Sequence, residues 1–282
     1  MKVLVLDPKG VVGHAVALYF KDCGHNVLGY GEKESPICNT VVGSYYEIDK
    51  LKQIIETSDF DAVINCVAVI NQDAENDKAH ASYINTFLPH FLAKITSNTN
   101  TVVVHRSTDC IFSGERGKYT LNDIPDATSY YARTKTLGEV INGKDITIRT
   151  SLIGPELDKE GKSLFNWFIN QEGEVNGYAN AIWTGLTTIE FAKNIEFLLK
   201  NKKHGIFQCV PNEPPISKYD LLVLFEEFFP KNRTINRIEN KLVDKSLVPE
   251  LGESNLKISS YRTMIVEMHA FIEKHKNLYK NY

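Results

Sequence analysis

The sequence predicts an α/β protein built on a doubly wound parallel sheet, followed by a smaller C-terminal region. Short apolar runs alternate with helical patterns through the first half of the 282 residues. A glycine turn follows the first apolar run, and a Thr, Tyr and Lys set follows later in the same half. Alternation of strands and helices is typical of a parallel sheet that binds ligands beyond the carboxyl ends of its strands.

Five apolar stretches are expected to be strands. Continuous apolar runs fit strands that are buried on both faces of a sheet, and they lie at residues 3–6, 26–30, 61–66, 101–105 and 145–149. Between them, apolar residues recur with helical spacing, at residues 11–22, 47–57, 74–98 and 129–141. This order of elements predicts a dinucleotide-binding (Rossmann) domain over residues 1–150.

The alternation ends after residue 150. Helices are expected near residues 162–170, 188–200, 217–229 and 261–276, with a short strand at 205–210. We expect residues 151–282 to form a smaller substrate-binding region that is partly interleaved with the first sheet. A segment near 177–188 is expected to return to that sheet.

Composition narrows the class of protein. The chain is 43% hydrophobic and 24% charged, with a net charge of −3, so no basic surface points to nucleic acid. The five cysteines are scattered without metal-ligand spacing, which predicts free thiols. No leader pattern or membrane-length apolar run is present in the sequence. We therefore expect a cytoplasmic protein with no metal, nucleic-acid or membrane partner.

The glycine turn is a candidate cofactor site. A turn that opens a helix offers backbone N–H groups to a pyrophosphate, and here the predicted cofactor-binding residues are Lys9, Gly10, Val11, Val12 and Gly13. Asp7 stands where the first glycine of such a motif is usual, and its carboxylate would repel phosphate. A tight turn without a ligand remains the alternative.

The charges near the second strand bear on which cofactor binds. Glu32 would favour the ribose hydroxyl of NAD, whereas Lys33 and Lys9 would favour the 2′-phosphate of NADP. We expect NADP(H) rather than NAD(H). The alternative is that both lysines are ordinary surface residues.

The chemistry is expected from Thr108, Tyr131 and Lys135. Tyr131 and Lys135 are four residues apart and share one face of a helix. The lysine ammonium would lower the pKa of the phenol and make it a proton donor near neutral pH. The Thr108 hydroxyl, at the end of a strand, would hydrogen-bond the same carbonyl oxygen.

Together these motifs resemble the extended short-chain dehydrogenases/reductases, and most closely the dTDP-4-dehydrorhamnose reductase group. The likeness covers roughly residues 1–150 and rests on four stretches, at residues 9–13, 61–68, 104–112 and 131–139. It implies NAD(P)H-dependent reduction of a nucleotide-linked 4-keto-6-deoxy sugar, in the making of surface polysaccharide. Asn85 also falls where the family has a similar residue.

The resemblance also implies roles for single residues. Tyr131 would protonate the keto oxygen, Lys135 would hold the nicotinamide ribose, and Thr108 would bind the substrate carbonyl. The nicotinamide would lie along the strand ends, at Cys66, Val67, Ala68 and Ser107. The residues expected to contact the sugar nucleotide are Thr108, Asp109, Arg149 and Trp183.

Alternatives remain for several residues and for the function. Asp109 could orient its loop, Trp183 could be a core residue, and His105 and Cys110 are expected to be structural. The stretch 180–188 departs from the family's Q-x-G-x-P-T-like segment, which leaves the sugar open. An epimerase or dehydratase is one alternative, and a non-catalytic NADP-binding regulatory subunit, as for methionine adenosyltransferase, is another. In related proteins the Tyr-Lys helix often forms a dimer seam, so a homodimer is possible.

Overall fold

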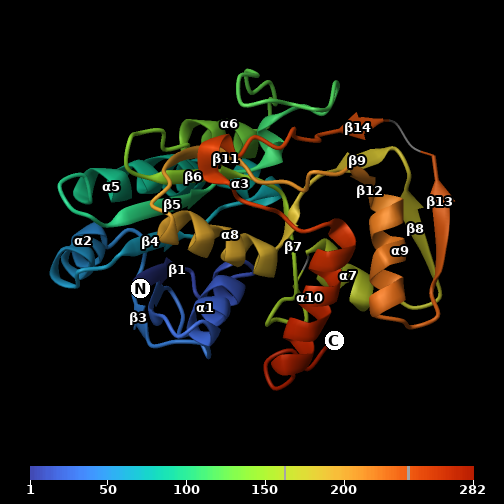
Figure 1. Cartoon of the computed structure of the whole chain (residues 1–282), viewed down its shortest axis with the longest axis horizontal. Helices are drawn as coiled ribbons and strands as arrows, with labels where there is room; N and C mark the ends of the chain where they lie inside the picture. Colours follow the sequence, from blue (N-terminus) through green and yellow to red (C-terminus); the bar gives the residue numbers. More distant parts are fainter. Residues whose placement is uncertain (162, 240–241) are drawn as a thin grey trace.

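The computed structural model describes residues 1–161, 163–239 and 242–282 (Figure 1). Its main sheet has seven strands in the order β11-β6-β5-β4-β1-β2-β3, and every neighbouring pair is parallel. The strands are β1 (Lys2–Leu6), β2 (Asn26–Gly31), β3 (Thr40–Val42), β4 (Ala62–Asn65), β5 (Val102–Arg106), β6 (Ile146–Arg149) and β11 (Gly205–Gln208). The predicted parallel sheet is confirmed, whereas β3 was not predicted.

Both faces of the sheet are buried. Val3 and Val5 belong to one hydrophobic cluster, while Leu4 and Leu6 belong to a second, as expected when side chains alternate across a strand. The first cluster includes residues of α1 (Gly13–Asp22) and α8 (Thr188–Lys200), and the second includes residues of α2 (Ile48–Thr57) and α5 (Leu88–Ile95). Helices therefore cover the sheet on both sides.

The single helix predicted over residues 74–98 is wrong. Helix α3 (Asn71–Asn76) ends before Asp77, whose φ of −127° and ψ of 85° are not helical. The Asp77 carboxylate then accepts from the His80 N–H at 2.9 Å and caps α4 (Lys78–Ser82). A π turn, η1 (Tyr83–Phe87), joins α4 to α5. A capping aspartate inside an apolar pattern thus divided the helix.

The later helices follow the predictions more closely. They are α6 (Tyr130–Leu137), α7 (Leu164–Ile169), α9 (Lys218–Phe228) and α10 (Tyr261–Lys274), together with α8, whose bounds match the prediction. Residue 162, the predicted start of α7, lies outside the described residues. Short 3-10 turns occur at η2 (Asp109–Ile111) and η3 (Gly252–Ser254).

The segment that returns to the main sheet is β11, which pairs with β6, and not residues 177–188 as predicted. Those residues form strands of small separate sheets: β8 (Glu174–Tyr178) pairs with β13 (Thr234–Ile238), and β9 (Ala181–Trp183) lies between β12 (Ile216–Ser217) and β14 (Val243–Asp244). A further pair joins β7 (Leu152–Ile153) and β10 (Leu186–Thr187). Figure 1 shows β8, β13 and α9 grouped at the end of the molecule away from α2 and α5. The division at residue 150 stays a prediction.

Candidate active site

The carboxyl ends of β1, β4 and β5 bring the candidate residues together. Because β4 lies between β1 and β5 and all three are parallel, the residues that follow them share one edge of the sheet. Asp7 follows β1, Cys66 follows β4, and Ser107 with Thr108 follows β5. The sequence motifs therefore meet at one place.

The glycine turn has the geometry of a phosphate cradle. Asp7 adopts a left-handed conformation with φ of 60°, and its carbonyl and carboxylate oxygens both accept from the Gly10 N–H at 3.1 Å. A Cβ on Gly13 would lie 2.0 Å from the Asp7 carbonyl oxygen, so only glycine allows α1 to start this close to β1. No side chain caps α1 at Val12. This helix start thus fits a pyrophosphate.

Asp7 carries an unusual carboxyl group for such a cradle. Burial raises its pKa to about 6, although the Gly10 N–H and the positive charge of Arg106 act in the opposite direction. The Asp7 carboxylate, which was expected to repel phosphate, accepts a hydrogen bond from the Gly10 N–H and stabilises the shape of the turn. Its negative charge is also partly balanced by a nearby arginine.

A groove of about 1170 Å³ runs from this turn along the strand ends. Six of the predicted cofactor residues line it, namely Lys9, Gly10, Val11, Lys33, Val67 and Ala68. Glu32 lines the groove too. Both the carboxylate expected to favour NAD and the lysine expected to favour NADP are therefore lining residues. Val12, Gly13, Cys66 and Ser107 are buried. Turn, helix start and groove together fit a dinucleotide.

Thr108 and Tyr131 are close to each other, in a buried setting. Thr108 is 6% exposed and Tyr131 is 7% exposed. Burial raises the pKa of Tyr131 to about 12, while Arg106 and a hydrogen bond with Thr108 lower it. The predicted lowering of this pKa by Lys135 is wrong: burial of the phenolate raises the pKa, and the neighbouring cation that lowers it is Arg106 and not Lys135. At neutral pH the phenol is protonated.

Lys135 ends a chain of buried polar groups. Its Nζ donates to the Arg106 carbonyl oxygen at 2.6 Å and lies 3.3 Å from Nε2 of His105. The other ring nitrogen of His105 is 3.3 Å from Nδ2 of Asn65, whose Oδ1 accepts from the Val67 N–H at 3.2 Å. Asn65 therefore donates to His105, and the remaining ring proton points at Lys135. Nζ of Lys135 must accept this proton, so Lys135 is a neutral amine. Burial and, to a smaller extent, the charge of Arg106 hold the pKa of Lys135 well below its usual range.

Arg106 is a functional candidate that sequence reasoning missed. It is the last residue of β5, and its Nε is buried with no partner in the part of the chain that the structure describes. Its positive charge lowers the pKa of Asp7, of Tyr131 and of Lys135. A cation at the carboxyl end of an otherwise apolar strand was the signal that could have identified it.

Arg149 is held by an ion pair beneath the site. Its Nε and Nη2 donate to the two carboxylate oxygens of Glu139, each at 2.7 Å, and Ser107 Oγ donates to Glu139 at 2.6 Å. Arg149 is 5% exposed, and its Nη1 has no protein partner among the described residues. The guanidinium thus ties β6 to the segment after α6. Its predicted contact with substrate stays a prediction.

The π turn braces α6 against the end of β4. Asn85 accepts from the Val69 N–H at 3.0 Å and donates to Thr134 Oγ1 at 3.1 Å. A Cβ on Gly138 would lie 1.8 Å from the Asn85 carbonyl oxygen, so this approach requires glycine. The contact explains why Asn85 and Gly138 appear together with the Tyr-Lys pair.

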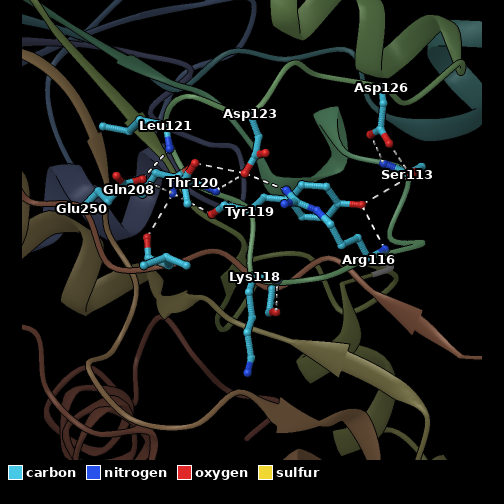
Figure 2. A network of polar contacts seen from close by, with 12 residues as sticks. Ser113, Arg116, Lys118, Tyr119, Thr120, Leu121, Asp123, Asp126, Gln208 and Glu250 are labelled. Atoms are coloured by element: carbon cyan, nitrogen blue, oxygen red, sulfur yellow. Dashed lines mark hydrogen bonds and ion pairs between the residues drawn. The ribbon is translucent and has the colours of Figure 1, made fainter.

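The loop that follows Thr108 is fixed by a network around Tyr119 (Figure 2). The Tyr119 ring stacks on Phe112 with centroids 4.2 Å apart, and its carbonyl oxygen accepts from Gln208 Nε2 at 2.9 Å. Glu250 accepts from the Leu121 N–H and from Gln208. The Arg116 guanidinium lies over the Tyr119 ring, 4.8 Å from its centroid, and forms an ion pair of 2.6 Å with Asp123 (Figure 2). The far end of the loop is therefore anchored to β11.

Trp183 and Asp109 are buried, whereas Cys110 is partly exposed. Trp183 is 5% exposed and packs against Tyr261 with ring centroids 5.8 Å apart, which favours the core interpretation over substrate binding. Asp109 is 4% exposed, and burial raises its pKa. Burial likewise raises the pKa of Cys110 to about 11.

All five cysteines are free. Within the described residues there is no acidic, His or Cys cluster suited to a metal, and no helix with the length and apolarity to cross a bilayer.

Curated relatives match the chain at low identity. A dTDP-4-dehydrorhamnose reductase of Aggregatibacter actinomycetemcomitans is 26% identical over 80% of this chain and 79% of its own length. The probable low-salt glycan biosynthesis reductase Agl14 of Haloferax volcanii is 29% identical over 49% of this chain. Methionine adenosyltransferase 2 subunit beta of Xenopus tropicalis is 26% identical, again over 49% of this chain. The chain spans less than half the length of the latter two, 48% and 41%.

Solved structures share the fold. A dTDP-4-dehydrorhamnose reductase of Bacillus anthracis in complex with NADP superposes with a TM-score of 0.79 at 17% identity, over 98% of this chain and 99% of that one. The model of the RmlD substrate binding domain matches residues 1–174, which contain the glycine turn, Thr108, Tyr131 and Lys135. The chain therefore belongs to the RmlD substrate-binding domain family.

Proposed function

We propose that this protein is a reductase that transfers hydride from NAD(P)H to the 4-keto group of a nucleotide-linked 6-deoxy sugar. The observation that carries the proposal is the buried, hydrogen-bonded pair Thr108 and Tyr131, whose neighbour Val69 lines the groove that begins at the glycine turn, although the pair itself does not line that groove. Family membership and the reductases among the relatives support the same reaction.

Each residue has one task in this proposal. The Thr108 hydroxyl donates to the keto oxygen and orients it toward Tyr131. The Tyr131 phenol gives its proton to the alkoxide that forms there; with a pKa near 12, it is in the donor form at neutral pH. Lys135 binds the ribose hydroxyls. A bound nicotinamide supplies the hydride when present.

Sugar-nucleotide contacts are proposed for Asp109 and Arg149, at the same strand ends. Trp183 contributes through the core beneath them rather than by contact. For the cofactor we propose NADP(H), because Lys9 and Lys33 both line the groove. Glu32 in the same wall is the group that would favour NAD(H). We further propose that the enzyme acts in the cytoplasm, where nucleotide sugars are made for surface polysaccharides.

The test is oxidation of NADPH and of NADH by the purified protein with a panel of dTDP-, UDP- and GDP-linked 4-keto-6-deoxy sugars. The proposal predicts one reduced cofactor consumed per sugar reduced. An epimerase converts the sugar without net cofactor consumption, so conversion with constant NADPH would replace the proposal by that alternative.

A regulatory subunit is the second candidate function, favoured by the similarity to methionine adenosyltransferase 2 subunit beta. It predicts dinucleotide binding without reduction of any sugar, together with co-purification of a partner protein. A homodimer through α6 belongs to the reductase proposal, and sedimentation of the purified protein tests it.

A further inference from the structure

The end of the chain forms part of the candidate cofactor groove. After α10, residues 275–282 (the clasp) turn at the end of that helix, and the chain ends beside it (Figure 1). Asn277, Leu278, Lys280 and Asn281 of the clasp line the same groove as Asp7, Lys9 and Gly10. Nothing in the sequence of the clasp resembles a nucleotide-binding motif.

A buried histidine links the clasp to the glycine turn. Nδ1 of His14 lies 2.8 Å from the Gly10 carbonyl oxygen, and Nε2 lies 3.0 Å from the hydroxyl of Tyr279. A carbonyl only accepts, so Nδ1 carries the proton and Nε2 accepts from Tyr279. His14 is fully buried and Tyr279 is 1% exposed. Burial lowers the pKa of His14 to about 4, which keeps this arrangement neutral at physiological pH.

Two further residues, Tyr282 and His275, fix the clasp. The Tyr282 ring stacks on Phe165 with centroids 5.3 Å apart. Its hydroxyl accepts from the Glu156 N–H at 2.8 Å and donates to Asn166 at 2.7 Å. His275 Nε2 lies 2.7 Å from a carboxylate oxygen of Asp22 at the end of α1. The clasp is thus attached at both of its ends and at Tyr279 between them.

These anchors determine where Lys280 lies. It directly follows Tyr279, which is hydrogen-bonded through His14 to Gly10, and it is exposed and lines both this groove and a second cavity beside Glu160. We propose that Lys280 is a dinucleotide-binding residue, whose ammonium contacts the pyrophosphate held at the glycine turn. This inference rests on the proposed cofactor use.

The negative charge of Asp7 favours a cation such as Lys280 beside a bound pyrophosphate. The turn carries the Asp7 carboxylate, which opposes an anion at the place where the N–H groups would receive it. Lys9 belongs to the turn, and Lys280 follows Tyr279, which is linked through His14 to Gly10. Both cations line the groove and offset its carboxylates, as does Lys159. Lys33 instead follows β2 and is suited to the ribose end. A contact with the pyrophosphate, which NADPH and NADH share, is therefore assigned to Lys280.

The experiment measures the dissociation constants of NADPH and NADH by fluorescence for the full chain and three variants. Lys280→Ala removes the charge and Lys280→Arg keeps it. Lys276→Ala is the matched control, since Lys276 belongs to the same segment but its ammonium pairs with Glu273 at 2.5 Å. Thermal unfolding of each variant verifies that it is folded.

A charge-assisted contact with phosphate predicts that Lys280→Ala raises both dissociation constants by about tenfold. Lys280→Arg and Lys276→Ala should stay within about twofold of the parent. Unchanged binding in Lys280→Ala, or a loss confined to NADPH, overturns the pyrophosphate assignment while the proposed function stands. If the parent protein binds neither dinucleotide, the proposed function fails first, and the role of Lys280 fails with it.

Discussion

The side-chain amine of Lys135 donates a hydrogen bond to the backbone carbonyl of Arg106, the residue whose side-chain charge lowers the pKa of Lys135. The Nζ to carbonyl distance is 2.6 Å. The arginine charge also acts on Tyr131 and on Asp7. Arg106 is therefore the electrostatic link between the proton donor and the glycine turn.

Removing the charge of Arg106 should raise the pKa of Asp7. In the parent protein that pKa is about 6, and Arg106 is one of the two groups that lower it. In Arg106→Leu we expect titration at a clearly higher pH, measured by carbon NMR of labelled aspartate carboxyls, with Asp7→Asn identifying the signal. Arg262→Leu, which removes an exposed arginine paired with Glu227, is the control. An unchanged Asp7 titration would show that the charge of Arg106 does not lower the pKa of Asp7.

Asp7→Asn should stabilise the protein at neutral pH. The folded-state pKa is raised from 3.8 to about 6 by burial, so the cost of the buried charge is absent below pH 4 and grows as the pH rises through 6. Asparagine keeps the acceptor for Gly10 and tolerates the left-handed backbone. The gain at pH 7.5 should be about 1–2 kcal/mol after allowing for partial exposure.

Denaturant unfolding at pH 7.5 and pH 4 measures this difference. The two proteins should differ at pH 7.5 and converge at pH 4. Equal stability at pH 7.5, or a variant that is less stable there, would contradict the assigned direction of the Asp7 pKa.

Glu139→Ala should be strongly destabilising. It leaves the buried Arg149 guanidinium without its two hydrogen bonds of 2.7 Å, and breaking a buried pair from one side costs roughly 3–5 kcal/mol. Glu239→Ala removes the partner of the exposed Arg237, and it should cost less than about 1 kcal/mol. Similar losses of unfolding free energy in the two variants would show that the Glu139 pair carries no special weight.

Tyr119→Phe should loosen the loop after Thr108 without unfolding the protein. The phenol accepts from the Gly114 N–H at 3.2 Å, and losing such a bond costs about 1 kcal/mol. Limited proteolysis should therefore cut residues 113–126 faster than in the parent. Tyr178→Phe, at a residue that is 47% exposed, is the control. Identical cleavage rates would mean that the Tyr119 hydroxyl does not hold the loop.

Local patterns predicted much of this fold. Continuous apolar runs identified five strands of the main sheet, and the bounds of α8 were predicted from its apolar spacing alone. The helix over residues 74–98 failed because Asp77 caps a new helix there, and a π turn follows. A strand at 205–210 was predicted, but local pattern did not show that this strand, β11, and not the segment near 177–188 pairs with β6 in the main sheet.

Sequence reasoning identified the candidate site residues that belong to short motifs. Thr108 and the glycine turn lie at the same edge of the sheet, as their positions after β5 and β1 imply, and Tyr131 of α6 is hydrogen-bonded to Thr108. The charge of Arg106 and the contact between His14 and Tyr279 were missed. That contact joins residues 265 positions apart in the sequence. Patterns within short segments cannot predict a contact of this kind. The direction of the Tyr131 pKa depends on burial, which only the folded chain reveals.

The most direct test of the central claim is the steady-state reduction of a 4-keto-6-deoxy sugar nucleotide by Tyr131→Phe. The account predicts that the variant binds NADPH within about twofold of the parent and loses on the order of 10²–10⁴ in kcat, because the proton donor is gone. A variant that reduces the sugar as fast as the parent would contradict the assignment of Tyr131 as the donor.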